Sequence, residues 1–159
     1  MSNELPCFRI HGEQNEFLLV QVLGRSHPQC DDYWDGNWIE AQISLSAGGF
    51  QGRFGASLRS EEFVRLRAGL RLVYASLGTT IPTHVAEFTT LEEQLSIKVV
   101  GDGLGHFTAE CVAVDEAGTG NRLEFTLRFD QTYIPAMLTG LDALIGAFPV
   151  KGNPARVGS

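Results

Sequence analysis

The sequence is poor in cysteine and in basic residues. Three cysteines, Cys7, Cys30 and Cys111, are spread over 159 residues, and no two of them form a Cys-x-x-Cys pair. An odd number of distant cysteines is not typical of a secreted disulfide scaffold, so a reducing compartment is the simpler expectation. Twelve Lys and Arg residues against nineteen Asp and Glu residues give a net charge of −7. Such a balance argues against nucleic acid as a direct partner, because contacts to phosphates need clustered positive charge.

The chain also lacks an uninterrupted apolar run. Its N-terminus has neither a basic start nor an apolar centre, so it does not predict a signal peptide. The most apolar stretch, residues 133–150, contains Asp142 and two prolines and has an amphipathic pattern. It therefore predicts a packed helix and not a membrane span. We expect a cytoplasmic protein with one globular domain over 1–150, followed by a flexible C-terminal tail over 151–159.

Alternation of apolar and polar residues predicts antiparallel strands. Residues 38–45 and 50–58 alternate on either side of Gly48-Gly49, which is a strong two-residue turn signal. The runs 95–99, 107–113 and 123–129 predict a meander, with a loop at 115–121. Further strands are expected at 8–10, 17–23 and 84–90.

Two segments have helical spacing. The first begins at Ser60, whose side chain we expect to cap it, and ends near Gly78. The second begins near Thr132, and Pro149 ends it. Because Gly140 and Gly146 lower the intrinsic stability of this helix, packing must hold it. The order of elements predicts an α+β fold, with a mainly antiparallel sheet built from hairpins and a meander and two helices packed on it.

One segment, residues 31–38, combines three aspartates with both tryptophans of the chain. Tryptophan and tyrosine are common interface anchors, and carboxylates can meet a basic partner. The alternative is a plain turn at Asp35-Gly36, with the tryptophans packed over the edge of the core. A calcium loop is excluded, since Tyr33 and Gln42 stand where oxygen ligands of an EF-hand would be needed. The residues predicted to bind a partner are Asp31, Asp32, Trp34, Asp35, Asp115 and Glu116.

The sequence predicts no catalytic, cofactor-binding or metal-binding residue. His27 and Cys30 have His-x-x-Cys spacing, but no second pair completes a zinc site. His106 and Cys111 are five positions apart on one predicted strand, so they should point to opposite faces and not form a nucleophile pair. Residues 81–150 carry ten acidic and three basic residues. Both a solvated sheet face and a docking face for a basic protein fit this imbalance.

Several motifs resemble those of the WapI-type immunity proteins of bacteria and their relatives. They are Trp34–Trp38, Gly52–Phe54, Gly105–Phe107, Asp130–Tyr133 and Phe148–Val150. The resemblance implies a protein that neutralises the toxic C-terminal domain of a contact-delivered toxin, inside the producing cell. It further implies that neutralisation is by binding, without catalysis or a cofactor. The expected partner is thus a protein, a basic toxin domain, and neither nucleic acid nor membrane.

Two alternatives remain open. An enzyme that uses His106 with a nearby carboxylate would have a deep polar cleft around that histidine. A small binding or regulatory module for an unknown ligand or partner would have an enclosed apolar pocket.

Overall fold

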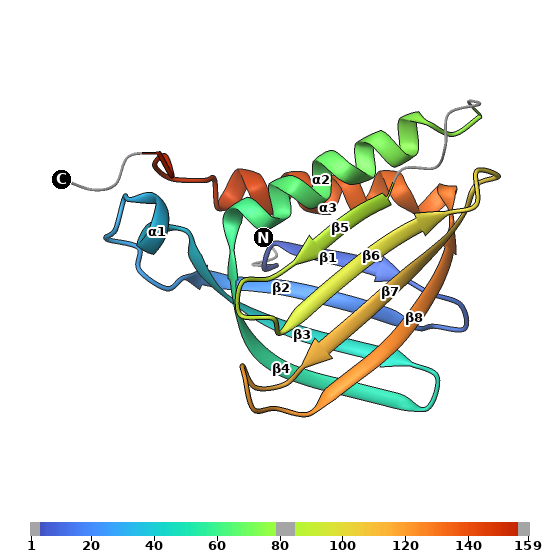
Figure 1. The fold of residues 1–159 in the computed structure, drawn as a ribbon, viewed down its shortest axis with the longest axis horizontal. Coiled ribbons are helices and arrows are strands. Elements are labelled where there is room, and N and C mark those ends of the chain that lie inside the picture. The colour runs from blue at the N-terminus through green and yellow to red at the C-terminus, as the bar shows by residue number, and fades with distance from the viewer. Residues whose placement is uncertain (1–3, 79–84, 156–159) are drawn as a thin grey trace.

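The computed structural model describes residues 4–78 and 85–155, and within them eight strands form two four-stranded antiparallel sheets (Figure 1). The first sheet has the order β1-β2-β3-β4, with β1 Cys7–His11, β2 Phe17–Arg25, β3 Trp38–Ala47 and β4 Phe50–Arg59. The second has the order β5-β6-β7-β8, with β5 Val85–Thr89, β6 Leu95–Gly101, β7 His106–Val114 and β8 Arg122–Asp130. The helices are α1 Tyr33–Gly36, α2 Ser60–Ala75 and α3 Ile134–Ala147, and the 3₁₀ turn η1 Gln131–Tyr133 precedes α3.

The predicted α+β class and the antiparallel pairing are confirmed. Ala47 pairs with Phe50 across the expected two-residue turn, where Gly48 has a φ of 58°. A positive φ at the first central residue suits a tight hairpin, and glycine adopts it without strain. The predicted meander is β6-β7-β8, and residues 85–89 of the expected run 84–90 form β5. Residue 84 lies outside the described residues. The division of the strands into two sheets was not predicted.

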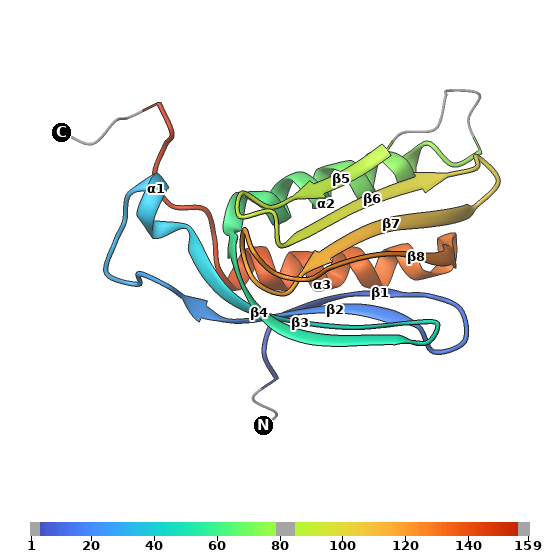
Figure 2. The same ribbon diagram turned by 60° about the horizontal axis from the view of Figure 1, so that its bottom comes forward.

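Each sheet is followed in the chain by one long helix, and each of these helices packs against the other sheet. Helix α2 follows the first sheet and packs against β5 of the second, whereas α3 follows the second sheet and packs against β1 of the first. The two helices also contact each other along one side of the sheets (Figure 2). The inward residues of both sheets and the buried faces of both helices form one hydrophobic core. No helix within the described ranges is long and apolar enough to span a bilayer.

A glycine marks each of these helix–strand contacts. A Cβ added to Gly69 of α2 would lie 3.1 Å from the Cα of Ala86 in β5. A Cβ added to Gly140 of α3 would lie 2.9 Å from the carbonyl oxygen of Cys7 in β1. The absence of a side chain therefore lets each helix lie close to the edge strand of the other sheet. The contact of α3 with β1 at Gly140 is the kind of packing that we expected to hold this helix.

The cap of α2 differs from the predicted one. Ser60 is the first helical residue, the N-cap is Arg59, and the buried Ser60 hydroxyl has no hydrogen-bond partner within the described ranges. The main-chain N–H of Arg59 instead donates to the buried carboxylate of Glu62 at 2.7 Å. The other Glu62 oxygen accepts from the N–H of Leu91 at 2.8 Å, so this carboxylate joins α2 to the β5–β6 loop. Burial raises the pKa of Glu62 to about 7.

Candidate partner-binding site

The aromatic and acidic segment predicted to bind a partner forms one helical turn, α1, and not the simple reversal at Asp35-Gly36. A side-chain oxygen of Asp32 caps this turn by accepting from the N–H of Asp35 at 2.9 Å. A Cβ at Gly36 would lie 2.8 Å from the carbonyl oxygen of Cys30, so only glycine fits there without a shift. Trp34 points outward with 52% of its surface exposed.

The side chain of Arg59, a residue that is only 2% exposed, holds the main chain of α1 in place. Its guanidinium donates to the carbonyl oxygens of Trp34 and Tyr33, at 2.7 Å each. The same guanidinium lies 4.8 Å from the centroid of the Trp38 ring and 5.4 Å from that of Tyr33. Charge-assisted hydrogen bonds and stacking on aromatic rings are both strong for a desolvated arginine. One buried side chain thus holds the main chain of α1 against the end of β4.

Asn37 and Lys151 close the other side of this turn. Asn37 is fully buried, and its side-chain amide donates to the carbonyl oxygens of Tyr33 and Lys151, at 2.9 Å each. Its side-chain oxygen accepts from the N–H of Lys151 at 2.8 Å. The Lys151 ammonium donates to the carbonyl of Cys30 at 2.9 Å and pairs with Asp31 at 3.3 Å. Lys151, the first residue of the expected flexible tail, is therefore tied to the domain.

Arg25 adds a third support from β2. It donates to the carbonyl oxygens of Gly36 at 2.7 Å and Pro149 at 2.6 Å. Arg25, Arg59 and Lys151 were missed by the sequence analysis, and Asn37 was included only as part of the Trp34–Trp38 motif. No local pattern could have indicated Arg25, Arg59 or Lys151, because each meets α1 only through the tertiary fold. Their effect is that the folded protein itself holds the main chain of α1 in place.

All six predicted contact residues are exposed, but they differ in what else they do. The Asp31 side chain is 92% exposed in spite of its contact with Lys151. Asp115 closes the loop between β7 and β8 by accepting from the main-chain N–H of Asn121 at 2.7 Å. Asp32 caps α1, as described above. Within the part of the chain that the structure describes, the side chains of Trp34, Asp35 and Glu116 make no hydrogen bond, and they present their polar or aromatic groups to solvent.

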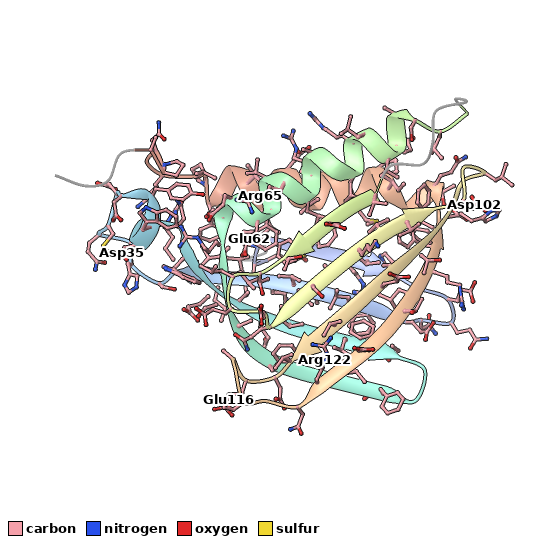
Figure 3. The ribbon with its side chains drawn as sticks, in the orientation of Figure 1. Asp35, Glu62, Arg65, Asp102, Glu116 and Arg122 are labelled. Carbon is pink, nitrogen blue, oxygen red and sulfur yellow. The ribbon has the colours of Figure 1, made fainter. Side chains whose placement is uncertain are left out.

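The fold brings the two predicted segments to one end of the molecule, which we call the acidic end. Figure 3 shows Asp35 and Glu116 at this end, away from Asp102. A shallow groove of about 570 Å³ is lined by His27, Trp38 and Ala117, which are near the two segments in sequence, but by none of the six predicted contact residues themselves. Glu40 in this groove accepts hydrogen bonds from Ser26 at 2.6 Å and Ser57 at 3.2 Å. Residues that are near both segments in sequence therefore meet in this groove.

A larger cleft lies around His106 at the opposite end, as the enzyme alternative requires. This His106 cleft has a volume of about 1270 Å³, and its lining includes His11, Asp102, Asp130 and Tyr133. The His106 side chain is 74% exposed, and its Nδ1 lies 2.9 Å from an Asp102 oxygen. The lining mixes charged and aromatic residues, unlike the enclosed apolar pocket expected of a small-ligand module.

Cys111 takes no part in this cleft. It is buried on the inner face of β7, whereas His106 is exposed on the outer face, as their spacing predicted. Burial raises the pKa of the Cys111 thiol to about 12, so the thiol stays protonated and is a poor nucleophile. Among the described residues, no group of three or more His, Cys, Asp or Glu side chains could hold a metal ion.

Comparison with known proteins identifies the family. The model of the family described as "Immunity protein WapI-like family" matches residues 9–149, which include both sheets, α1 and both long helices. The chain therefore belongs to the WapI-like immunity protein family. No curated protein matches it. A solved structure described as "The Siderocalin Ex-FABP functions through dual ligand specificities" is 8% identical, covers 99% of this chain and 97% of that chain, and has a TM-score of 0.26. So low a score carries no argument about fold or function.

Proposed function

We propose that this protein neutralises a toxin domain by binding it through the acidic end, without catalysis and without a cofactor. Membership of an immunity protein family supports the class of function. We place the binding site at α1 because Trp34 is exposed there, on a turn whose main chain is held by the buried Arg59. An exposed tryptophan on a preorganised turn is well suited to be an interface anchor.

The partner in this proposal is a basic protein domain. Asp31, Asp32, Asp35, Asp115 and Glu116 are exposed at the acidic end, and the chain as a whole carries a charge of −7. Such a field accelerates capture of a positively charged partner, and salt weakens the acceleration. The same charge disfavours nucleic acid and anionic membranes as direct partners. The proposed place of action is the cytoplasm of the cell that makes the toxin.

The first experiment is a pull-down with the tagged chain from its own host's lysate, at low and at moderate salt. We expect a stoichiometric partner with a basic, toxic C-terminal domain, retained less well as the salt concentration rises. No such partner at either salt concentration would contradict the proposal.

The captured partner then allows a test of the surface. The double variant Asp35→Lys with Glu116→Lys should slow association by about tenfold and reduce its dependence on salt. A control with the same change of charge is Glu87→Lys with Glu124→Lys, at exposed positions on the outer face of the second sheet. Equal slowing in both double variants would show long-range attraction alone and would remove the acidic end from the interface.

The His106 cleft favours one second candidate, an enzyme that uses His106 with Asp102. Their contact of 2.9 Å is suitable for proton transfer, but the imidazole is largely solvated. A His106→Gln variant separates the candidates, since it should leave neutralisation of the captured toxin unchanged if the protein acts by binding at the acidic end. Loss of neutralisation with retained binding would favour the enzyme.

A further inference from the structure

The His106 cleft is not used by the proposed function, although it is the larger of the two concave sites described above. Three connections that are distant in sequence meet at it, together with parts of β7 and β8: the β1–β2 loop at 12–16, the β6–β7 turn at Asp102, and the passage from β8 into η1 at Asp130 and Tyr133. Figure 1 shows these connections together at the end of the sheets far from α1. The cleft is therefore separate from the acidic end.

Two fixed carboxylates flank His106 in this cleft. Asp102 is 2.9 Å from the imidazole, and Asp130 is the residue directly opposite His106 in the β7–β8 register. Hydrogen bonds from the N–H groups of Leu104 and His106 lower the pKa of Asp102. Hydrogen bonds from Thr132 lower the pKa of Asp130. Both carboxylates are therefore ionised at neutral pH and are held in place by the main chain around them.

Aromatic rings form another part of the lining. The His11 ring stacks on Tyr133 with centroids 5.3 Å apart and an angle of 29° between the planes. Burial and the charge of Arg9 lower the pKa of His11, so this imidazole is neutral at pH 7. The Arg9 guanidinium itself lies 4.5 Å from the centroid of the Phe17 ring, which also lines the cleft. The cleft thus already holds one guanidinium of this chain on an aromatic face.

The net negative charge of the residues that line the cleft favours a cationic ligand. Five carboxylates and two guanidinium groups line the cleft, which leaves an excess of negative charge. An anion would be repelled, whereas a planar or flexible cation could contact ionised oxygens and aromatic faces together. The volume of about 1270 Å³ also leaves room for main chain on either side of such a group.

We propose that the His106 cleft binds an arginine or lysine side chain on an exposed segment of a protein partner, at a site separate from the acidic end. This proposal depends on the proposed function in one respect only, namely that the partner is a basic protein.

The test is an NMR titration of the ¹⁵N-labelled full chain with N-acetyl-arginine N-methylamide, which mimics an arginine within a protein. We expect saturable shifts at the amides of Gly12, Asp102, His106 and Tyr133, and none at 34–37. The double variant Asp102→Asn with Asp130→Asn should weaken binding at least tenfold, whereas Glu87→Gln with Glu124→Gln, an equal change of charge elsewhere, should not. Tyr133→Leu removes an aromatic wall without changing charge and should also weaken binding.

Three results would overturn the proposal. They are the absence of saturable shifts in the cleft, equal weakening in the control double variant, and equal binding of N-acetyl-glutamate N-methylamide. Because the titration uses a small probe and no toxin, it stands apart from the proposed function. A missing partner in the pull-down would contradict that function without affecting the result of the titration.

Discussion

The buried guanidinium of Arg59 donates a hydrogen bond of 2.7 Å to the carbonyl oxygen of Trp34 and lies 5.6 Å from the centroid of the Trp34 indole ring. One side chain thus fixes both the main chain and the aromatic group of the exposed anchor. The relationship links the core to the proposed interface, because Arg59 is also the N-cap of α2. Whatever loosens Arg59 should loosen the acidic end.

Replacing Arg59 by lysine keeps the charge but removes the planar group that reaches two carbonyls and stacks on aromatic rings. We expect Arg59→Lys to lower the free energy of unfolding by roughly 2–4 kcal/mol, since lysine cannot keep both charge-assisted hydrogen bonds to the carbonyls of Tyr33 and Trp34 or the stacking on the aromatic rings. Urea unfolding measures the loss, and amide hydrogen exchange at 35–37 should accelerate. Arg53→Lys is the control, because Arg53 is exposed on β4 and, among the described residues, donates only to Gln42. Equal losses in the two variants would contradict the assigned role.

Gly140 and Gly146 lie on the same helix but should respond in opposite directions to alanine. Alanine normally stabilises a helix interior by about 0.5–1 kcal/mol relative to glycine. Gly146→Ala should show this gain, since nothing lies within 4 Å of the added Cβ. Gly140→Ala should instead destabilise by roughly 1–3 kcal/mol, because its Cβ would meet the carbonyl of Cys7 at 2.9 Å. Thermal unfolding of the two variants checks the prediction, and a gain at both positions would refute the close contact between α3 and β1.

Glu62 should make the stability of the wild-type protein depend on pH. Its pKa is about 7 in the folded protein, mainly through burial, against an ordinary value of 4.5. Between these values the folded chain binds more protons than the unfolded chain, so Glu62 makes stability fall as pH rises from 4.5 through 7. The shift corresponds to roughly 3 kcal/mol.

Glu62→Gln isolates this contribution because glutamine does not titrate. The difference in unfolding free energy, wild type minus Glu62→Gln, should decrease by roughly 3 kcal/mol between pH 4.5 and pH 8. Urea unfolding at a series of pH values measures it. A difference that stays constant over this range would mean that the carboxylate is not buried as described.

Cys111 should be unreactive until the protein unfolds. Burial raises its pKa to about 12, so almost no thiolate is present near neutral pH. In a variant with Cys7→Ser and Cys30→Ser, Cys111 should resist Ellman's reagent at pH 8 and should react at the rate of a free thiol in urea. Rapid reaction of the folded variant would contradict the position of Cys111 in the core.

The local patterns of the sequence predicted the strands and the two long helices, because alternation and helical spacing are imposed by the single buried face of each element. They could not predict that β4 and β5 belong to different sheets, since that depends on the path of α2 between them. The cap of α2 was misassigned although the contact that forms it is local. Ser60 has the right side chain, but the N–H of Arg59 donates to Glu62, three residues along the chain. Only the contact of the other Glu62 oxygen with Leu91 joins distant residues.

The composition of residues 31–38 suggested the candidate site, because tryptophans beside clustered aspartates are recognisable without a structure, but it did not show that Trp34 is exposed. It did not distinguish Asp32, which caps α1, from Asp35, which has no such role. It also gave no indication of Arg59 or Lys151, because their contacts with α1 join distant parts of the chain. The His106 cleft could be predicted only as a requirement of an alternative function, since three separate connections meet at it.

Titration of the captured toxin domain with the purified chain tests the central claim most directly. The toxic activity is measured as the ratio of the two proteins is raised. A non-catalytic immunity protein should abolish the activity with a sharp end point at one equivalent, as expected for tight one-to-one binding. Activity that persists in excess of the chain, or that disappears at a small fraction of one equivalent as an enzyme would achieve, would contradict the account.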